Sequence, residues 1–490
     1  MARRGRGGLS IRPSRVEKFT GEDPCIVLND YSSAAKPLEA LKIGVDSGKV
    51  DVALPALVDT FLNLNRQLLE LYEIKAVPTM TLNGVPKILF ETGDVVGACP
   101  LVSPVTGKYD LGVVIEPRIG WDGLGPMLTT MGFKVVPELQ DLCSLPRSDR
   151  EIPSWVIASV VVKRIESLLL DMSRRYEIRR ENLSSPRGRV DWGEYVTRNF
   201  PQMKLVDIPC EYSQLEDNRA LMGVIHYTLR FIQSDLMSQL SGGTVVLELI
   251  ARIEALIRRV GAYPIVQPDS ILLQRWLYAG IQSVSLDPAL EAMRWTAEGR
   301  GLAGRSDLCG LPWKMHMSAF FEAYVETVVR QAVALTGGEV LVGRKNETDM
   351  NIRWDTRIGA SQKYLLPDIL VKRGRQTVVV DAKFKNFKQE MSMQDWMDIP
   401  EMSRDEHRND LLQVLAYTTA FPNTPLFACL VYPVEDTLYD ELKERHILHQ
   451  HAQISENGRD VDIIITAVPM CGDITGVARE FAEALIEMRD

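Results

Sequence analysis

Two carboxylates and a lysine lie on adjoining apolar segments in the last third of the sequence. Asp368 interrupts the apolar run 365–371, and Asp381 follows the β-branched run 378–380, two residues before Lys383. An aspartate inside an apolar strand is costly to bury unless it is paired or holds a metal ion. Two carboxylates can hold Mg²⁺ beside a phosphodiester, where the ion polarises the phosphoryl oxygen and lowers the pKa of an attacking water. The pattern therefore indicates metal-dependent phosphodiester hydrolysis.

The two apolar segments are predicted to form a β-hairpin, because residues 372–375 between them carry a glycine turn. Strand alternation places Asp381 and Lys383 on one face. There the lysine can orient the water or neutralise charge that develops on the phosphate. The alternative is a surface hairpin in which Asp381 and Lys383 form a solvated pair, but the Pro367-Asp368 dipeptide at this spacing favours a site.

Two flanking helices are predicted to add side chains to this site. Glu322 lies in the first turns of a helix that begins at residue 317. It is a candidate acidic ligand, with a favourable charge near a helix N-terminus as the alternative. Downstream, a helix over residues 410–417 places Gln413 and Tyr417 one turn apart on one face, where they can support the site.

These residues resemble the PD-(D/E)xK nuclease motif, with Asp368, Asp381 and Lys383 as its members. The wider set of segments is similar to the McrC family, the nuclease subunit of McrBC-type modification-dependent restriction systems. The resemblance is densest over residues 301–435 and weaker over 187–190, 210–212 and 217–218, whereas 120–126 does not align. Its segments are Phe-Glu-x-Tyr-Val at 321–325, Pro-Asp-Ile at 367–369, Asp-Ala-Lys-Phe-Lys at 381–385 and Leu-x-Gln-x-Leu-Ala-Tyr at 411–417.

The resemblance implies a cofactor, a substrate and a partner. Asp368, Asp381 and Glu322 would hold Mg²⁺, for which Mn²⁺ can substitute, and Lys383 would act on the water or the transition state. The substrate would be double-stranded DNA, and a dimer of the chain would allow both strands to be cut. The partner would be a McrB-like AAA+ GTPase or ATPase ring into which the N-terminal part of the chain inserts.

Composition limits the class of protein. The chain has 490 residues, 46% hydrophobic and 25% charged, with a net charge of −9 that argues against a uniformly basic nucleic-acid coat. There is no G-x4-G-K-S/T loop, no membrane-spanning apolar run and no signal peptide. Seven scattered cysteines without a C-x2-C pair indicate reduced thiols. We expect a cytoplasmic protein without a nucleotide site of its own.

Basic residues around the hairpin are candidates for holding the DNA backbone. A solvated charged face is the alternative. His446, His449 and His451 also lie close together, but no cysteine or second histidine cluster completes a zinc site. The basic candidates are Lys372, Arg373, Arg375, Lys385 and Lys388.

The pattern predicts a multidomain α/β protein. A flexible basic tail is expected over 1–20 and an N-terminal, β-rich α+β region that binds the partner over 21–150. Residues 151–300 read as a mostly helical connector. Residues 301–490 are predicted to form the PD-(D/E)xK domain, a mixed sheet flanked by helices.

The leading hypothesis is a Mg²⁺-dependent endodeoxyribonuclease that forms the cleavage subunit of a restriction or anti-phage defence complex. A second is a non-cleaving adaptor that binds and activates the motor. A third is a stand-alone nuclease that acts on single-stranded DNA or RNA. The presence of Asp368, Asp381 and Lys383 together favours the first over the second.

Overall fold

The computed structural model describes most of the chain between residues 25 and 487. The predicted tail, residues 1–20, lies outside the described residues. Within 25–487 the segments left out are 38–53, 81–85, 141, 143–144, 146–154, 173–176, 215–218, 239–242, 270–271, 274–275, 277–283, 298–310, 353, 355–361, 386–400, 422–425, 457–458 and 471–472.

The chain forms two compact units. The first contains Met1–Pro153, Gly243–Val245 and Leu302–Asp490, and the second contains Ser154–Gly242 and Val246–Gly301. The predicted N-terminal and C-terminal regions therefore share one unit, and the predicted connector corresponds closely to the other.

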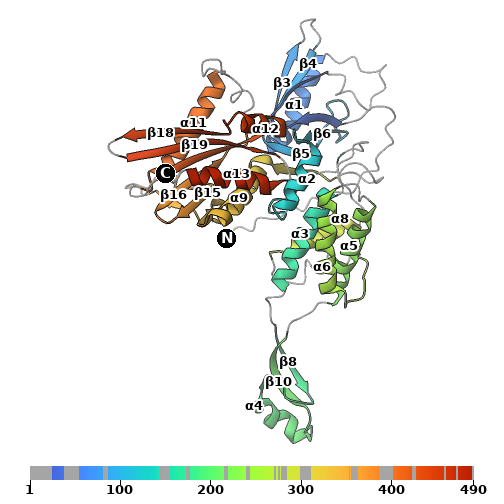
Figure 1. Ribbon diagram of the computed structural model, residues 1–490. Helices are drawn as coiled ribbons and strands as arrows, with labels where there is room; N and C mark the ends of the chain where they lie inside the picture. Colours follow the sequence, from blue (N-terminus) through green and yellow to red (C-terminus); the bar gives the residue numbers. More distant parts are fainter. Residues whose placement is uncertain are drawn as a thin grey trace. The chain divides into compact units, whose positions relative to one another are not determined.

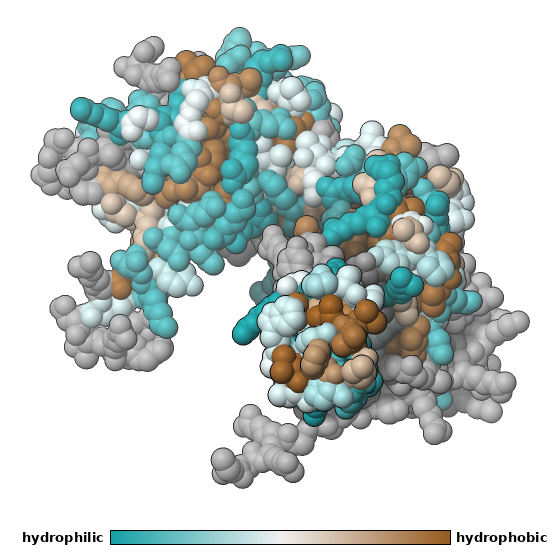
Figure 2. All heavy atoms as spheres, turned by 90° about the horizontal axis from the view of Figure 1, so that it is seen from below, coloured by the Kyte–Doolittle hydropathy of each residue, from teal (hydrophilic) through white to brown (hydrophobic). Residues whose placement is uncertain are grey.

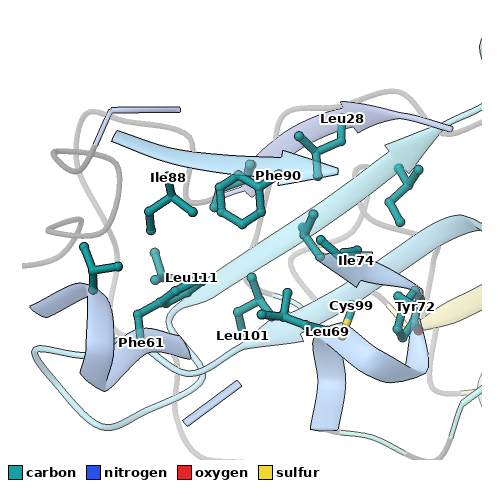
Figure 3. Packing of buried hydrophobic residues seen from close by; sticks show 14 of the residues in the cluster. Leu28, Phe61, Leu69, Tyr72, Ile74, Ile88, Phe90, Cys99, Leu101 and Leu111 are labelled. Carbon is teal, nitrogen blue, oxygen red and sulfur yellow. The ribbon is translucent and has the colours of Figure 1, made fainter. Parts of the chain in front are cut away.

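The N-terminal part of the first unit is built on two small sheets and one long helix. Its core consists of apolar side chains from both sheets and from the helix α1, among them Phe61, Tyr72, Phe90 and Leu101 (Figure 3). Five strands form one sheet in the order β1-β6-β5-β11-β7, and three form another in the order β2-β4-β3. The bounds are β1 Cys25–Asn29, β2 Ser33–Pro37, α1 Leu54–Leu71, β3 Ile74–Met80, β4 Pro86–Thr92, β5 Val95–Leu101, β6 Leu111–Glu116, α2 Gly120–Thr130, β7 Glu138–Leu139 and β11 Trp313–His316.

Strand β11 joins the N-terminal part to the C-terminal part of this unit. It pairs antiparallel with β5, so that Trp313 lies opposite Ala98. The long helix α9, Met317–Thr336, follows directly. Its first turn is anchored by Asp94, whose backbone carbonyl accepts from Met317 N (2.8 Å) and whose carboxylate accepts from Ser318 N (3.2 Å). The start of α9 is thus fixed to the N-terminal sheet.

The C-terminal part is a six-stranded mixed sheet flanked by helices, which confirms that part of the predicted fold (Figure 1). Its order is β12-β15-β16-β17-β19-β18; β16, β17 and β19 run parallel, and the other pairs are antiparallel. Alternate side chains such as Val379 and Leu430 pack with Val414 of α11 and Leu442 of α12. The bounds are β12 Glu339–Val342, β13 Met350–Asn351, β14 Tyr364–Leu365, β15 Ile369–Arg373, β16 Gln376–Ala382, α11 Glu401–Thr418, β17 Leu426–Val434, α12 Asp436–Glu444, β18 His449–Glu456, β19 Arg459–Pro469 and α13 Ile474–Glu487.

The second unit contains the predicted helices and, in addition, a small sheet that sequence patterns did not predict. Strands β8, β9 and β10 pair antiparallel around β10. Strand β8 reads Glu-Ile-Arg-Arg-Glu-Asn-Leu and lacks the apolar run by which a strand is usually found. The bounds are α3 Trp155–Met172, β8 Glu177–Leu183, β9 Arg189–Val190, α4 Trp192–Glu194, β10 Ile208–Gln214, α5 Arg219–Met237, α6 Thr244–Val260 and α8 Leu286–Ala297.

Large apolar side chains are exposed between β9 and β10. Met203 is 79% exposed and Val206 is 72% exposed. A grouping of this kind is typical of a surface that contacts another macromolecule. Part of the apolar surface of the molecule is visible from below (Figure 2). The full set is Trp192, Val196, Phe200, Met203, Leu205 and Val206.

No helix within the described residues is both long and apolar enough to cross a membrane. In the same residues, the thiols of Cys25, Cys99, Cys210 and Cys429 are buried and form no disulfide.

The junction between β5 and β11 leaves no room for a side chain at Gly97. A Cβ there would lie 2.2 Å from the carbonyl oxygen of Trp313. We expect Gly97→Ala to push β11 away and to lower the free energy of unfolding by about 1–3 kcal/mol, as overpacking does. Urea denaturation of the purified chain measures this. Gly123→Ala on α2 is the control, since a Cβ there makes only ordinary contacts; equal stability of the two variants would contradict the argument.

Candidate active site

The two predicted aspartates meet at one end of the β15–β16 hairpin. Ile369 lies opposite Val380 in the ladder, so Asp368 and Asp381 lie just beyond this pair on their two strands. The carboxylate of Asp368 accepts from the backbone N–H of Ala382 at 2.8 Å. The side chain of Asp381 is fully buried. The structure therefore contains the predicted hairpin and places Asp368 next to Asp381, as the sequence predicts.

Lys383 faces Asp381, as strand alternation predicts. Its Nζ lies 2.6 Å from Asp381 Oδ2 and donates to Gln413 Oε1 at 2.9 Å. The amide of Gln413 in turn donates to the hydroxyl of Tyr417 at 2.8 Å. The structure therefore brings Gln413 and Tyr417 of α11 into one hydrogen-bonded line with the lysine.

Glu322 on α9 completes the acidic group. Its charge acts on Asp368, and the charge of Asp381 acts on it, so the three carboxylates belong to one electrostatic cluster. Arg344 lies 3.7 Å from Glu322 Oε1. All four predicted catalytic or ligand residues, Glu322, Asp368, Asp381 and Lys383, thus come together from separate elements.

Burial sets the protonation of this cluster. Burial, followed by the charges of Asp381 and Glu322, raises the pKa of Asp368 well above its ordinary value. Burial also raises the pKa of Glu322 to about 7, with Arg344 opposing the shift. Burial disfavours the charged form of Lys383, but Asp381 outweighs that effect and the pKa of the lysine is raised. Buried carboxylates that are held close together despite the unfavourable energy of their charged forms are typical of a site for a cation.

The donor set fits a hard divalent cation. Oδ1 of Asp381 is buried and has no hydrogen-bond partner, although a buried carboxylate oxygen normally has one. Three carboxylates supply the oxygen ligands that Mg²⁺ takes in proteins. The donor chemistry of Asp368 and Asp381, with Glu322 in the same electrostatic cluster, therefore fits such an ion.

Comparison with known proteins assigns this part of the chain. Residues 306–433 match the family model described as McrBC 5-methylcytosine restriction system component. The similarity to the McrBC family therefore lies in this region. The matched residues contain Glu322, Asp368, Asp381 and Lys383, so the resemblance found from the sequence motifs is confirmed at the level of the family.

Two solved structures with similar chains contain McrB and McrC assemblies of Thermococcus gammatolerans. One is a refined half-complex from a tetradecameric assembly of McrB AAA+ hexamers with bound McrC, at a TM-score of 0.39 and 13% identity, covering 95% of this chain and 100% of that one. The other is the McrBC complex, at a TM-score of 0.24 and 13% identity, covering 63% and 88%. Similarity at this level establishes no shared fold. No curated protein matches the sequence.

The basic residues around the hairpin do not form one patch beside the carboxylates. Lys372 and Arg375 are exposed but flank the β15–β16 turn, about five residues or roughly 16 Å along the strands from Asp381. Arg373 is 7% exposed and donates to the backbone carbonyls of Leu485 and Thr336, which removes it from the candidate phosphate-binding residues. These three residues therefore do not adjoin the carboxylates, and DNA contact by Lys372 and Arg375 stays a prediction.

Lys385 and Asp410 form a second charged pair beside the site. Lys385 donates to both oxygens of Asp410, at 2.9 and 3.1 Å, and Tyr432 donates to the same carboxylate. Asp410 is 4% exposed, and its charge acts on Asp381. Sequence analysis did not assign Asp410, although it lies one turn before Gln413 on the same helix. Lys388 lies outside the described residues.

The histidines do not form a metal site with one another in the described residues. His449 lies on β18, and its ring nitrogen Nδ1 forms a hydrogen bond with the hydroxyl of Thr466 on the neighbouring strand. Within the described residues, the three side chains whose ligand atoms all lie within 4.8 Å of one another are those of Glu73, Asp94 and His316. Asp94 already serves as the anchor of α9.

The N-terminal sheet touches the loop that carries Lys383. Arg118 follows β6 and places its guanidinium over the rings of Phe384 (4.6 Å) and Tyr31 (5.4 Å). Phe384 also packs against Phe321 of α9. Asp30 is buried and accepts from the backbone N–H of Arg118 at 2.5 Å. The residue directly after the lysine is thus held between the N-terminal sheet and α9.

Glu326, one turn after Glu322, holds three cations. It is 1% exposed and contacts Lys134 (3.0 Å), Arg330 (2.8 Å) and Arg344. Burial opposes its charged form, but the three cations outweigh that effect and lower the pKa of Glu326 to about 2. The carboxylate orients Arg344 toward Glu322.

We expect Glu326→Gln to lower the free energy of unfolding by about 2 kcal/mol at pH 7, since a charged hydrogen-bond acceptor is lost. A lowered pKa stabilises the fold above the unfolded value of 4.5 and ceases to do so as pH falls toward 2. The difference between wild type and variant should therefore be constant from pH 7 to 5 and shrink below 4.5. Thermal denaturation over this range measures it. A difference that grows on acidification would contradict the assignment.

Proposed function

We propose that this chain is a Mg²⁺-dependent endodeoxyribonuclease, a McrC-like cleavage subunit of a restriction system that works with an AAA+ GTPase or ATPase. The observation that carries the proposal is the convergence of Glu322, Asp368, Asp381 and Lys383 inside the region that matches the McrBC family. The PD-(D/E)xK pattern and its mixed sheet support the same reaction class.

Each residue has a chemical role in this proposal. Asp368, Asp381 and Glu322 hold the metal ion through carboxylate oxygens. Mg²⁺, when bound, polarises the phosphoryl oxygen and lowers the pKa of water. Lys383 stays protonated, because its pKa is raised by Asp381, and its ammonium group neutralises charge on the phosphate or orients the water. Gln413, itself held by Tyr417, fixes the position of the ammonium group.

We expect Asp381→Ala to lower the rate of Mg²⁺-dependent DNA cleavage by at least about 100-fold, the loss seen when a main electrostatic contact to a transition state is removed. The measurement is cleavage of double-stranded DNA by the purified chain, with and without a McrB-like AAA+ protein. Asp460→Ala, at an exposed position of the same sheet, is the matched control.

The outcomes separate the three functions. Loss of cleavage in Asp381→Ala, with dependence on the motor, supports the proposal. Cleavage by wild type without the motor favours a stand-alone nuclease, and RNA or single-stranded DNA as substrate tests that directly. Stimulated nucleotide hydrolysis without any cleavage favours the adaptor. Cleavage that persists in Asp381→Ala rejects the site.

A contact surface for the motor is proposed on the apolar side chains between β9 and β10. The predicted N-terminal region, residues 21–150, is the alternative contact. Deleting that region cannot test it, because β5 and β6 form one sheet with β11 and the deletion would remove the partners of β11. Surface substitutions leave the core intact and are preferable.

We expect Met203→Glu combined with Val206→Glu to weaken binding of the motor at least tenfold, since two charges would replace apolar side chains in the contact. The melting temperature should stay unchanged because both side chains are exposed. Leu335→Glu on α9 is the matched control, with its side chain 66% exposed in the other unit and outside residues 21–150. Isothermal titration of the motor into each variant measures the effect. Equal affinity of the double variant and the control would place the contact elsewhere.

A further inference from the structure

A surface hollow lies next to the candidate active site. It has a volume of about 470 Å³ and is lined by Gln362, Lys363, Tyr364, Leu366 and Tyr417. Four of these residues lie in or next to β14, in the segment that leads to Asp368, and the fifth lies on α11. None of the first four has been given a role in the reaction.

The hollow is continuous with the catalytic machinery through Tyr417. The hydroxyl of Tyr417 accepts from Gln413, and Gln413 accepts from Lys383. Two hydrogen bonds therefore separate the wall of the hollow from the lysine. A polynucleotide whose phosphate lies at Lys383 can extend along this wall.

One aromatic ring of the lining, and a second ring that is bonded to a lining residue, are exposed to solvent. Tyr364 is 44% exposed and Trp354 is 52% exposed. Both are held by backbone contacts: Asn351 and Tyr364 lie opposite each other in the β13–β14 ladder, and Trp354 Nε1 donates to the carbonyl of Gln362 at 2.6 Å. Large exposed rings that are held by contacts of this kind are typical of surfaces that contact a ligand.

The lining has the chemistry of a nucleotide site. Aromatic rings stack on nucleobases of any sequence, and an ammonium group pairs with the backbone phosphate. Lys363 is exposed and adjoins Tyr364 in the sequence. Rings can stack only on a base whose face is open, so the hollow suits an unpaired nucleotide and not an intact base pair.

We propose that this hollow binds an unpaired nucleotide of the cleaved strand next to the scissile phosphate, with its base against Tyr364 and its phosphate on Lys363. This inference rests on the proposed nuclease function and adds that the duplex is locally opened at the cut.

The test measures DNA binding apart from cleavage. Asp381→Ala protein, in full length and with Mg²⁺, is titrated into fluorescent single-stranded and blunt duplex DNA of the same sequence, and anisotropy is recorded. In this background Tyr364→Ala should weaken binding of the single strand about tenfold, as the loss of one stacked base does. Tyr364→Phe should bind like the parent, because the ring remains. The loss on the blunt duplex should be smaller.

Lys363→Ala should reduce the slope of log Kd against log salt by about 0.7 on the single strand, the contribution of one phosphate contact. The chain supplies a matched control: Lys108-Tyr109 is another exposed Lys-Tyr pair, in the loop between β5 and β6, and Tyr109 is 45% exposed. Lys108→Ala and Tyr109→Ala should leave binding unchanged.

Binding by Tyr364→Ala equal to that by Tyr109→Ala would overturn the inference, and so would equal losses on single strand and duplex. Circular dichroism of each variant confirms that the fold is kept. Cleavage by the wild-type chain tests the nuclease proposal separately. If the chain cuts DNA but Tyr364→Ala leaves binding unchanged, only the proposed nucleotide site in the hollow is rejected. If the chain never cuts DNA, the proposed nuclease function is rejected.

Discussion

The mutual repulsion of three carboxylates is the constraint on which the candidate site depends. Asp368, Asp381 and Glu322 lie in one cluster, and burial raises the pKa of each of them. Lys383 contacts Asp381 directly, and Arg344 lies near Glu322. Such a cluster persists only because the surrounding fold positions each side chain independently. Divalent cations relieve this kind of repulsion.

The fold meets that constraint by fixing each carboxylate through a different contact. The β15–β16 ladder and the Ala382 N–H fix Asp368 relative to Asp381. Glu322 depends on α9, whose start is tied to the N-terminal sheet by Asp94 and by the pairing of β11 with β5. Arg118 extends the same dependence to the loop of Lys383 by covering Phe384. The N-terminal sheet therefore belongs to the structural support of the site as well as to its own core.

The hydrogen bonds from Lys383 to Gln413 and from Gln413 to Tyr417 connect the candidate active site to the neighbouring hollow. At one end stands the ammonium group beside Asp381, and at the other the hollow with the exposed ring of Tyr364. A catalytic group held by polar contacts and a neighbouring ring surface are complementary to a phosphate and to a base, respectively. The two ends together suit a polynucleotide better than a small phosphate ester.

Local patterns in the sequence were sufficient to predict the hairpin and its site residues Asp368, Asp381 and Lys383. They also predicted the helices that carry Glu322, Gln413 and Tyr417. These features depend on local periodicity and on short spacings, which are visible in the sequence itself. The tertiary fold was needed to see that β11 joins the N-terminal sheet, that Arg118 covers Phe384 and that Arg373 is buried. It also shows that Lys372 and Arg375 lie at the turn end of the hairpin, opposite to the end that carries the carboxylates. A run of basic residues does not reveal which end of a hairpin each one occupies or which carbonyl it meets, because strand pairing and burial are set by the whole sheet and not by neighbours along the chain.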